Sequence, residues 1–364
     1  MKAWAAALGA AVLTGCSTLD GPGYYAQAVQ GHLKLMAQAR PVADWLHDPA
    51  TPAPLRERLA LSQRIRDFAV AELHLPDNPS YRRYADLKRR SVVWNVVATP
   101  ELSLQLQQWC FPVAGCVGYR GYYAEADAQA FAQPLRAQGL DVTVYGVPAY
   151  STLGWLNWLG GDPLLNTFLN YPEGELARIV FHELAHQVVY VNDDTLFNES
   201  FASFVEQQGA QRWLAERASD AARADYQRFD ARRREFRALA QRTRDALRQL
   251  YGEATPGSAR GDRHGQPPAR ADDAALRAGK AHILEAFRAD YRALREAWGG
   301  WAGYDAWVAQ AGNASFAVQG AYEELVPGFA ALFEREGRDW RRFYDAVRAL
   351  AQQPRAERRA ALAR

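Results

Sequence analysis

Two histidines and a glutamate within residues 181–187 carry the most specific chemical signal of the chain. His182, Glu183 and His186 form an H-E-x-x-H motif inside a helical pattern. Residues four apart lie on one face of a helix, one turn from each other, so both imidazoles can reach one metal ion. In such motifs the histidines hold Zn²⁺ and the glutamate is the general base. The spacing therefore predicts zinc-assisted hydrolysis, most often of a peptide bond.

A catalytic zinc site takes a third protein ligand and leaves one position for water. Glu199 is the best candidate, because a turn predicted at 192–195 would fold the next helix back over the first. Asn198 can cap that helix, which places Glu199 in its first turn, where an anion is favoured. The other acids in reach remain rivals: Asp193, Asp194 and Glu206.

The remaining roles at this site are less specific. Glu183 would take a proton from the metal-activated water and pass it to the leaving amine. Glu206 could orient His182 or His186 by a hydrogen bond, or be a solvated charge. The oxyanion needs a further donor, and the candidates, for which core packing is the alternative, are Tyr150, Tyr190 and Tyr322. The histidines without a motif are expected not to be ligands: His32, His47, His74, His264 and His282.

Residues 1–16 have the layout of an export signal. A short basic start precedes an apolar run, residues 3–12, which is too short for a permanent membrane span. The run ends in Leu-Thr-Gly-Cys, which resembles a lipobox, so Cys16 would become a lipidated first residue. The alternative is an ordinary secretory signal with an incidental cysteine. With Ser17 next, the prediction is a lipid-anchored protein of the bacterial envelope, in the outer membrane facing the periplasm.

Two further cysteines, Cys110 and Cys116, fit this compartment. Export to an oxidising environment favours a disulfide between them, and two free buried thiols are the alternative. The absence of a nearby histidine argues against a second metal site. The net charge of the 364 residues is +2, which does not indicate a nucleic-acid surface.

Hydrophobic periodicity indicates the elements that must position the motif. The predicted class is α+β, predominantly α, with a helical region at 17–90 and a zincin-like core at 91–210. That core contains a small mixed sheet before the motif helix, with strands at 92–98, 115–123 and 141–147 and a helix at 124–138. An aromatic connector at 148–171 would be packed down and could line a cleft, or be a plain buried connector.

The motif helix begins at Pro172 and should end near 191–194, and the next helix should begin about Asn198. Residues 211–300 predict a long antiparallel helical hairpin with a flexible tip at 255–270. Its basic run 232–234 is interpreted as a solvated face. Residues 301–352 should form two or three helices, and residues 353–364 a frayed basic tail.

Several runs of the sequence resemble a bacterial family described as putative aminopeptidases, which comprises exported or lipid-anchored zincin-type proteins. The runs are residues 24–28, 115–122, 145–155, 162–165, the motif helix and 194–202. The Asn-Glu-Ser-Phe-Ala element resembles the third-ligand element of gluzincin peptidases, which implies Glu199 as a zinc ligand. Its spacing from His186 is shorter than in the large gluzincin aminopeptidases. The acidic motif that binds a free N-terminus in those enzymes has no counterpart here.

The sequence thus predicts a zinc metallopeptidase anchored to the lipid bilayer through Cys16, with an aminopeptidase as the first expectation. An endopeptidase or envelope-remodelling peptidase is the alternative among enzymes. A different class is a non-catalytic envelope lipoprotein whose helical hairpin binds a protein partner. Glu183 argues against that class, because a structural zinc site is usually closed by four ligands and has no use for a general base.

Overall fold

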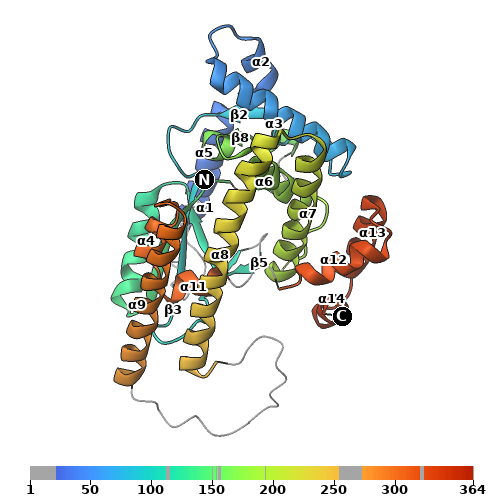
Figure 1. The fold of residues 1–364 in the computed structure, drawn as a ribbon. Helices are drawn as coiled ribbons and strands as arrows, with labels where there is room; N and C mark the ends of the chain where they lie inside the picture. The colour runs from blue at the N-terminus through green and yellow to red at the C-terminus, as the bar shows by residue number, and fades with distance from the viewer. Residues whose placement is uncertain are drawn as a thin grey trace, which may run out of the picture.

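The computed structural model describes residues 22–111, 115–149, 151–152, 154, 157–192, 194–253, 273–319 and 324–363. Helices make up most of these ranges, with small sheets between them, which agrees with the predicted α-rich α+β class (Figure 1). No helix within them is long and apolar enough to cross a membrane. Several predicted features lie outside them: the export signal with Cys16, Asp193, Tyr150, Tyr322, His264 and the hairpin tip.

The N-terminal region is helical, as predicted, and a small sheet joins it to the connector before the motif. Its helices are α1 (Pro22–Gln38), α2 (Val42–His47) and α3 (Ala53–Ala71). The sheet consists of β1 (Arg40–Pro41), β2 (Arg83–Ala85) and β8 (Leu164–Leu165). Strand β2 pairs antiparallel with β1 and parallel with β8, so segments about eighty residues apart in sequence become neighbours.

A second three-stranded sheet precedes the motif helix, as predicted, but it is antiparallel rather than mixed. Its strands, in spatial order, are β6 (Arg120–Tyr122), β3 (Val93–Thr99) and β7 (Asp141–Val147). Helix α4 (Glu125–Ala137) packs on this sheet through Ala128, Ala132 and Leu135. These side chains lie against Val96 and Val144, whose β-branched shape suits a buried pleated surface.

The segment predicted as one strand at 115–123 forms two strands in different sheets. Strand β5 (Gly115–Val117) pairs with β4 (Trp109–Phe111) in a hairpin, whereas β6 belongs to the antiparallel sheet with β3 and β7. Cys110 lies directly opposite Cys116 in the hairpin register, and the two are joined by a disulfide. Opposed side chains in an antiparallel pair are close enough for such a bond.

The connector before the motif helix is only partly packed down. It contains a short turn, η1 (Asn157–Leu159), and helix α5 (Asn166–Leu169). Asp162 and Phe168 are buried, whereas Trp158 is 78% exposed, so the prediction of a packed connector is wrong for this indole. Burial of Asp162 is supported by hydrogen bonds to its carboxylate from the Thr152 backbone N–H at 3.0 Å and the Ser151 hydroxyl at 3.3 Å.

Helices α6 (Glu173–Ala185) and α7 (Thr195–Glu216) form the centre of the molecule and lie side by side (Figure 1). Their facing residues, among them Phe181 and Phe204, are buried in one large core. Gly209 lets the helices approach, because an added Cβ there would lie 2.6 Å from Leu73 and 2.8 Å from Phe181. The candidate site is therefore built on two helices that pack closely against each other in the core.

Two long helices, α8 (Asp220–Tyr251) and α9 (Asp273–Ala297), form the predicted hairpin. The first begins at Asp220 rather than at 211, because residues 211–216 still belong to α7. Phe236 and Phe287 pack between the two helices. Helices α10 (Asp305–Ala309) and α11 (Asn313–Gln319) cover this contact, and α11 also contacts strands β3 and β7.

The C-terminal region packs on α7 and ends in a helix rather than in a frayed tail. It comprises α12 (Val326–Arg335), α13 (Trp340–Ala351) and α14 (Arg355–Leu362). The described residues between 301 and 352 therefore form four helices, whereas two or three were predicted. Helix α14 is fixed because Arg358 is buried in an ion pair with Asp194, and because Gly328 lets the backbone at Leu362 approach α12.

Candidate metal centre

The motif helix ends earlier than predicted but keeps the motif geometry. Pro172 precedes the first residue of α6, and Glu173 and Glu175 lie in the first turn of this helix, where the helix dipole favours acids. The α-helix stops at Ala185, and His186 is its C-cap with helical backbone angles (φ −58°, ψ −22°). The His186 N–H still donates to the His182 carbonyl at 3.3 Å. Both histidines therefore share one face, although the helix does not continue to 191–194.

Helix α7 begins three residues before the predicted start, so the predicted roles of two residues change. Asp194 is its N-cap and accepts a hydrogen bond from the Phe197 N–H at 3.4 Å. Asn198 is not the cap: its side chain accepts from the Val191 N–H at 2.8 Å and donates to the Val191 carbonyl at 2.7 Å. Asn198 thus fixes the turn that brings α7 back toward α6.

Glu199 converges with the two motif histidines on one point. The Nε2 atoms of His182 and His186 are 3.1 Å apart. The Glu199 Oε2 atom lies 3.3 Å from the first of these and 3.7 Å from the second. Within the described ranges this is the one group of His, Cys, Asp and Glu residues that could hold a metal ion. The rival Asp194 is buried in ion pairs elsewhere.

The donor set and its spacing fit zinc. Bonds of about 2.0–2.1 Å in a tetrahedral site place neighbouring donors about 3.3 Å apart. The three separations around His182, His186 and Glu199 lie within a few tenths of an ångström of that value. Two imidazole nitrogens and one carboxylate oxygen form the donor set of many catalytic zinc sites, which leave the fourth position open.

Glu206 holds the imidazole of His182 in one tautomer. Its Oε2 lies 3.1 Å from His182 Nδ1. A carboxylate can only accept, so Nδ1 carries a proton, and Nε2, which faces Glu199 and His186, is the ring nitrogen left for a metal ion. Burial acts to raise the pKa of Glu206, but Arg178 and His182 outweigh it and hold the pKa at about 2. The side chain is 13% exposed, which excludes a solvated charge.

Behind Glu206 lies a chain of buried charges that sequence reasoning missed. Arg178, on α6, donates to Glu206 and, at 3.4 Å, to Glu175. Arg233, from α8, donates to both oxygens of Glu175 at 2.6 and 2.7 Å. The Arg233 side chain is only 11% exposed, so the interpretation of residues 232–234 as a solvated face is wrong at this position. We call Glu206, Arg178, Glu175 and Arg233 the charge chain.

The acid–base properties of the motif suit proton transfer. Burial raises the pKa of Glu183 to about 7, with His182 opposing the rise and Glu199 adding to it. Burial lowers the pKa of His186 to about 4, so this imidazole is neutral and able to bind a metal. Burial also acts to lower the pKa of His182, but its hydrogen bonds to Glu199 and Glu206 outweigh it and leave the pKa raised.

Of the predicted tyrosines, the structure places Tyr190 beside the site, with its ring 6.4 Å from that of His186. It also brings in two tyrosines that sequence reasoning missed. Burial raises the pKa of Tyr119 well above its usual range, and the charges of Glu199 and Glu183 add to the rise. Burial likewise raises the pKa of Tyr145, whose hydroxyl accepts from Asn95 at 3.5 Å. No motif surrounds these residues, although both lie in runs that carried the family resemblance.

The fold and these converging side chains define an α-rich protein with a candidate metal centre on two packed helices. The chain belongs to the family described as "Putative aminopeptidase", whose sequence model matches residues 23–362. No curated protein and no solved structure matches the chain. The family name suggests peptidase activity. The matched range includes every residue of the candidate site.

Proposed function

We propose that the protein is a zinc-dependent peptidase, with an aminopeptidase as the first expectation. The observation that carries this proposal is the convergence of His182, His186 and Glu199 at the spacing of tetrahedral zinc ligands. Glu183 beside them distinguishes a hydrolytic site from a structural one, because a closed structural site needs no base. Membership of the family supports the peptidase assignment.

The roles of the residues follow from their positions. His182, His186 and Glu199 would hold Zn²⁺, which when bound makes water more acidic and polarises a carbonyl. Glu183 accepts the proton of the attacking water and passes it to the leaving amine. A carboxyl pKa of about 7 suits both steps, since the group can accept and release a proton near neutral pH.

The test combines metal analysis with Glu183→Gln. We expect one zinc per chain in both the wild type and the variant, and a loss of peptide hydrolysis of about 10²–10⁴-fold or more in the variant. Bound zinc in the inactive variant is the control for an intact site. Hydrolysis unaffected by Glu183→Gln would contradict the mechanism. Wild-type protein that neither retains zinc nor gains activity from it would favour the non-catalytic binding module.

Whether the enzyme is an aminopeptidase is decided by the substrate. An aminopeptidase binds a free N-terminal ammonium group, so we expect turnover of short peptides with a free N-terminus and little turnover of the same peptides after N-acetylation. The ratio of kcat/KM for the two forms is the measurement. Equal kcat/KM values for the free and the N-acetylated peptides would contradict the exopeptidase assignment and favour an endopeptidase.

We further propose that the protein is a lipoprotein of the bacterial envelope, acylated at Cys16 and facing the periplasm from the outer membrane. The lipobox-like residues 13–16 support this proposal. Labelled palmitate should be incorporated into the wild type and not into Cys16→Ala. Labelling that persists in the variant would contradict acylation at this residue.

A further inference from the structure

Helix α1 presents a row of large apolar side chains to solvent. Tyr25, Val29 and Leu33 are 39%, 59% and 53% exposed. Their spacing of four residues places them on one face of the helix. In the described ranges only Trp158 and Tyr171 are other large apolar side chains with such exposure, so this row is where exposed apolar groups gather. Grouped apolar surface of this kind marks an interaction site more often than scattered residues do.

The helix is also nearly free of charge. It contains no acidic residue, and Lys34 is its only basic one besides the buried His32, whose pKa is lowered by burial. The chain as a whole is 23% charged, so an exposed helix with one charge is unusual for it. The missing acids matter, because a carboxylate on this face would resist contact with a lipid surface.

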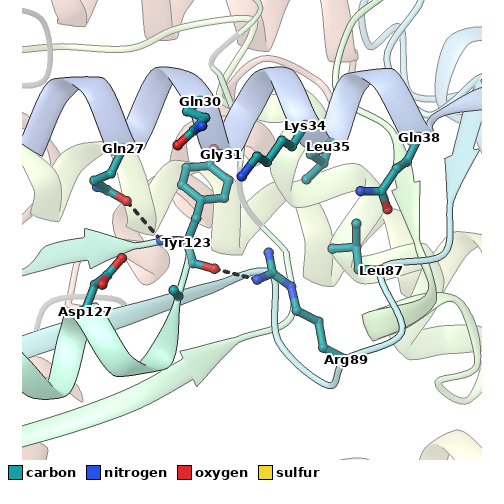
Figure 2. A pocket seen from close by; sticks show the side chains of 11 residues that line it. Gln27, Gln30, Gly31, Lys34, Leu35, Gln38, Leu87, Arg89, Tyr123 and Asp127 are labelled. Atoms are coloured by element: carbon teal, nitrogen blue, oxygen red, sulfur yellow. Dashed lines mark hydrogen bonds between the residues drawn. The ribbon is translucent and has the colours of Figure 1, made fainter.

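The polar side of α1 lies next to the apolar row and is separate from it. Gln27, Gln30 and Lys34 border a pocket of about 340 Å³ that Arg89 also lines (Figure 2). Helix α1 is therefore amphipathic on its accessible side, with an apolar edge and a polar edge that carries a cation. Helices that lie in the headgroup region of a bilayer have this distribution, with a lysine at the boundary.

The position of α1 in the chain places this face near a bilayer. Pro22, its first residue, is six residues after Cys16. A chain spans at most about 3.3–3.6 Å per residue, so an acylated Cys16 holds the start of α1 within about 20 Å of the membrane. Tyr25, the first residue of the row, lies near the end of the helix that is closest in sequence to Cys16.

We propose that the row Tyr25, Val29 and Leu33 docks on the lipid surface to which Cys16 anchors the chain. This inference rests on the proposed acylation and not on the peptidase activity. Three partly exposed side chains would bind a membrane weakly from free solution. The anchor makes the contact intramolecular, and the high effective concentration lets a small apolar row suffice. The contact fixes which side of the protein faces the bilayer.

The test uses the acylated full-length protein in vesicles of phosphatidylethanolamine and phosphatidylglycerol. Leu33→Cys introduces the one reactive thiol, because Cys110 and Cys116 are bonded to each other and Cys16 would be acylated. The thiol carries an environment-sensitive nitrobenzoxadiazole fluorophore. We expect acyl-chain-brominated lipid to quench it at least about twofold more than the same label at Arg338→Cys, on the distant turn between α12 and α13 (Figure 1).

A pair of neighbouring substitutions provides the matched control. In the labelled protein, Val29→Asp places a charge in the row, whereas Gln30→Asp places the same charge on the polar side. We expect the first to reduce quenching at position 33 at least about twofold and the second to leave it nearly unchanged. Circular dichroism and unchanged peptide hydrolysis show that both variants are folded.

Three results would overturn the proposal. Equal quenching at positions 33 and 338 would show that the row does not touch lipid. Protection of the label from aqueous iodide without vesicles would show that protein covers the row instead. Failure of the wild type to incorporate palmitate at Cys16 would remove the anchor, while the peptidase proposal would stand or fall separately on Glu183→Gln.

Discussion

His182 is held by a series of residues rather than by a single partner. Glu206 contacts its Nδ1 atom, Arg178 neutralises Glu206, and Glu175 connects Arg178 to Arg233 on another helix. Each charge in this series is compensated by the next, because an unpaired buried charge would be strongly destabilising. The orientation of one candidate metal ligand therefore depends on residues of α6, α7 and α8.

Replacement of Arg178 by methionine should weaken the support of His182 without changing any of the three candidate metal ligands. The change leaves the carboxylates of Glu206 and Glu175 buried without their shared cation, so Glu206 gains a proton more easily and holds His182 less firmly. We expect zinc affinity to fall about 10–100-fold, as measured by competition with a fluorescent chelator. We also expect the free energy of unfolding of the metal-free protein to fall by about 3–5 kcal/mol.

Arg338→Met is the control for this experiment. Arg338 forms an exposed ion pair with Glu334, four residues earlier in sequence, and such pairs contribute little. The control should therefore keep wild-type zinc affinity. An Arg178→Met variant with wild-type affinity would show that the charge chain does not position His182.

The residues of the candidate site differ in how far sequence could predict them. His182, Glu183 and His186 are predictable because helical periodicity alone places them together. Glu199 can be proposed as their neighbour from the sequence because a short turn brings back the following helix. Arg233 could not be found, because its partner Glu175 lies 58 residues away and only the packing of α8 on α6 joins them.

At the scale of elements, Asp194 has two functions at the start of α7. It caps the helix that carries Glu199, and it accepts hydrogen bonds from Arg358 and Arg359 of α14. Its side chain is fully buried. Burial acts to raise the pKa of Asp194, but the two guanidinium groups outweigh it and hold the pKa below its ordinary value. The same carboxylate thus joins a local cap to a contact across the fold.

Asp194→Asn should separate these two functions, because asparagine caps helices as well as aspartate does but carries no charge. The buried Arg358 is left unpaired, so we expect a loss of about 3–5 kcal/mol in the free energy of unfolding at pH 7. The lowered pKa means that the contribution is present above the ordinary carboxyl pKa and is lost as pH falls through the depressed one. Denaturation of both proteins between pH 7 and pH 3 should therefore show their stabilities converging at low pH.

Asp339→Asn is the matched control. Asp339 caps α13 by accepting from the Arg342 N–H at 3.0 Å, but it lies at the surface and pairs with no buried cation among the residues that the structure describes. Little change is expected in this variant. If Asp194→Asn were equally mild, the ion pair with α14 would not contribute to stability.

Three wrongly predicted boundaries depend on side-chain contacts that local periodicity does not contain. These boundaries are the frayed tail, the late end of α6 and the start of α7. Arg358 pairs with Asp194, 164 residues earlier, and fixes α14, whereas the Asn198 side chain binds the Val191 backbone, seven residues earlier, and fixes the turn between α6 and α7. The strands at 92–98 and 141–147 and the two hairpin helices needed no such contact, since their periodicity is strong.

At the scale of the whole molecule, the candidate metal centre lies on the helix pair that joins several regions. Helix α6 contacts α3 of the N-terminal region and α8 of the hairpin, and α7 contacts α12 of the C-terminal region. A ligand that binds this pair only in the folded state should therefore stabilise the entire protein.

Zinc should raise the melting temperature accordingly. At a free zinc concentration of about 100 times Kd, the expected stabilisation is about 2.7 kcal/mol, which should be visible as a rise in Tm in differential scanning calorimetry. Treatment with a chelator should reverse it. His186→Ala is the control, because it lacks one of the three proposed ligands and should show a much smaller rise. An equal rise in the variant would indicate zinc binding elsewhere.

The contact between α14 and Asp194 has a consequence for biosynthesis. A polypeptide is synthesised with its N-terminus first, so Arg358 and Arg359 are made 164 and 165 residues after the carboxylate that they neutralise. Until they arrive, the start of the helix that carries Glu199 has an uncompensated acid at its cap. A prematurely terminated chain that contains the entire H-E-x-x-H motif would therefore lack the residues that fix the start of the helix carrying Glu199, so the candidate metal centre would lose part of its support.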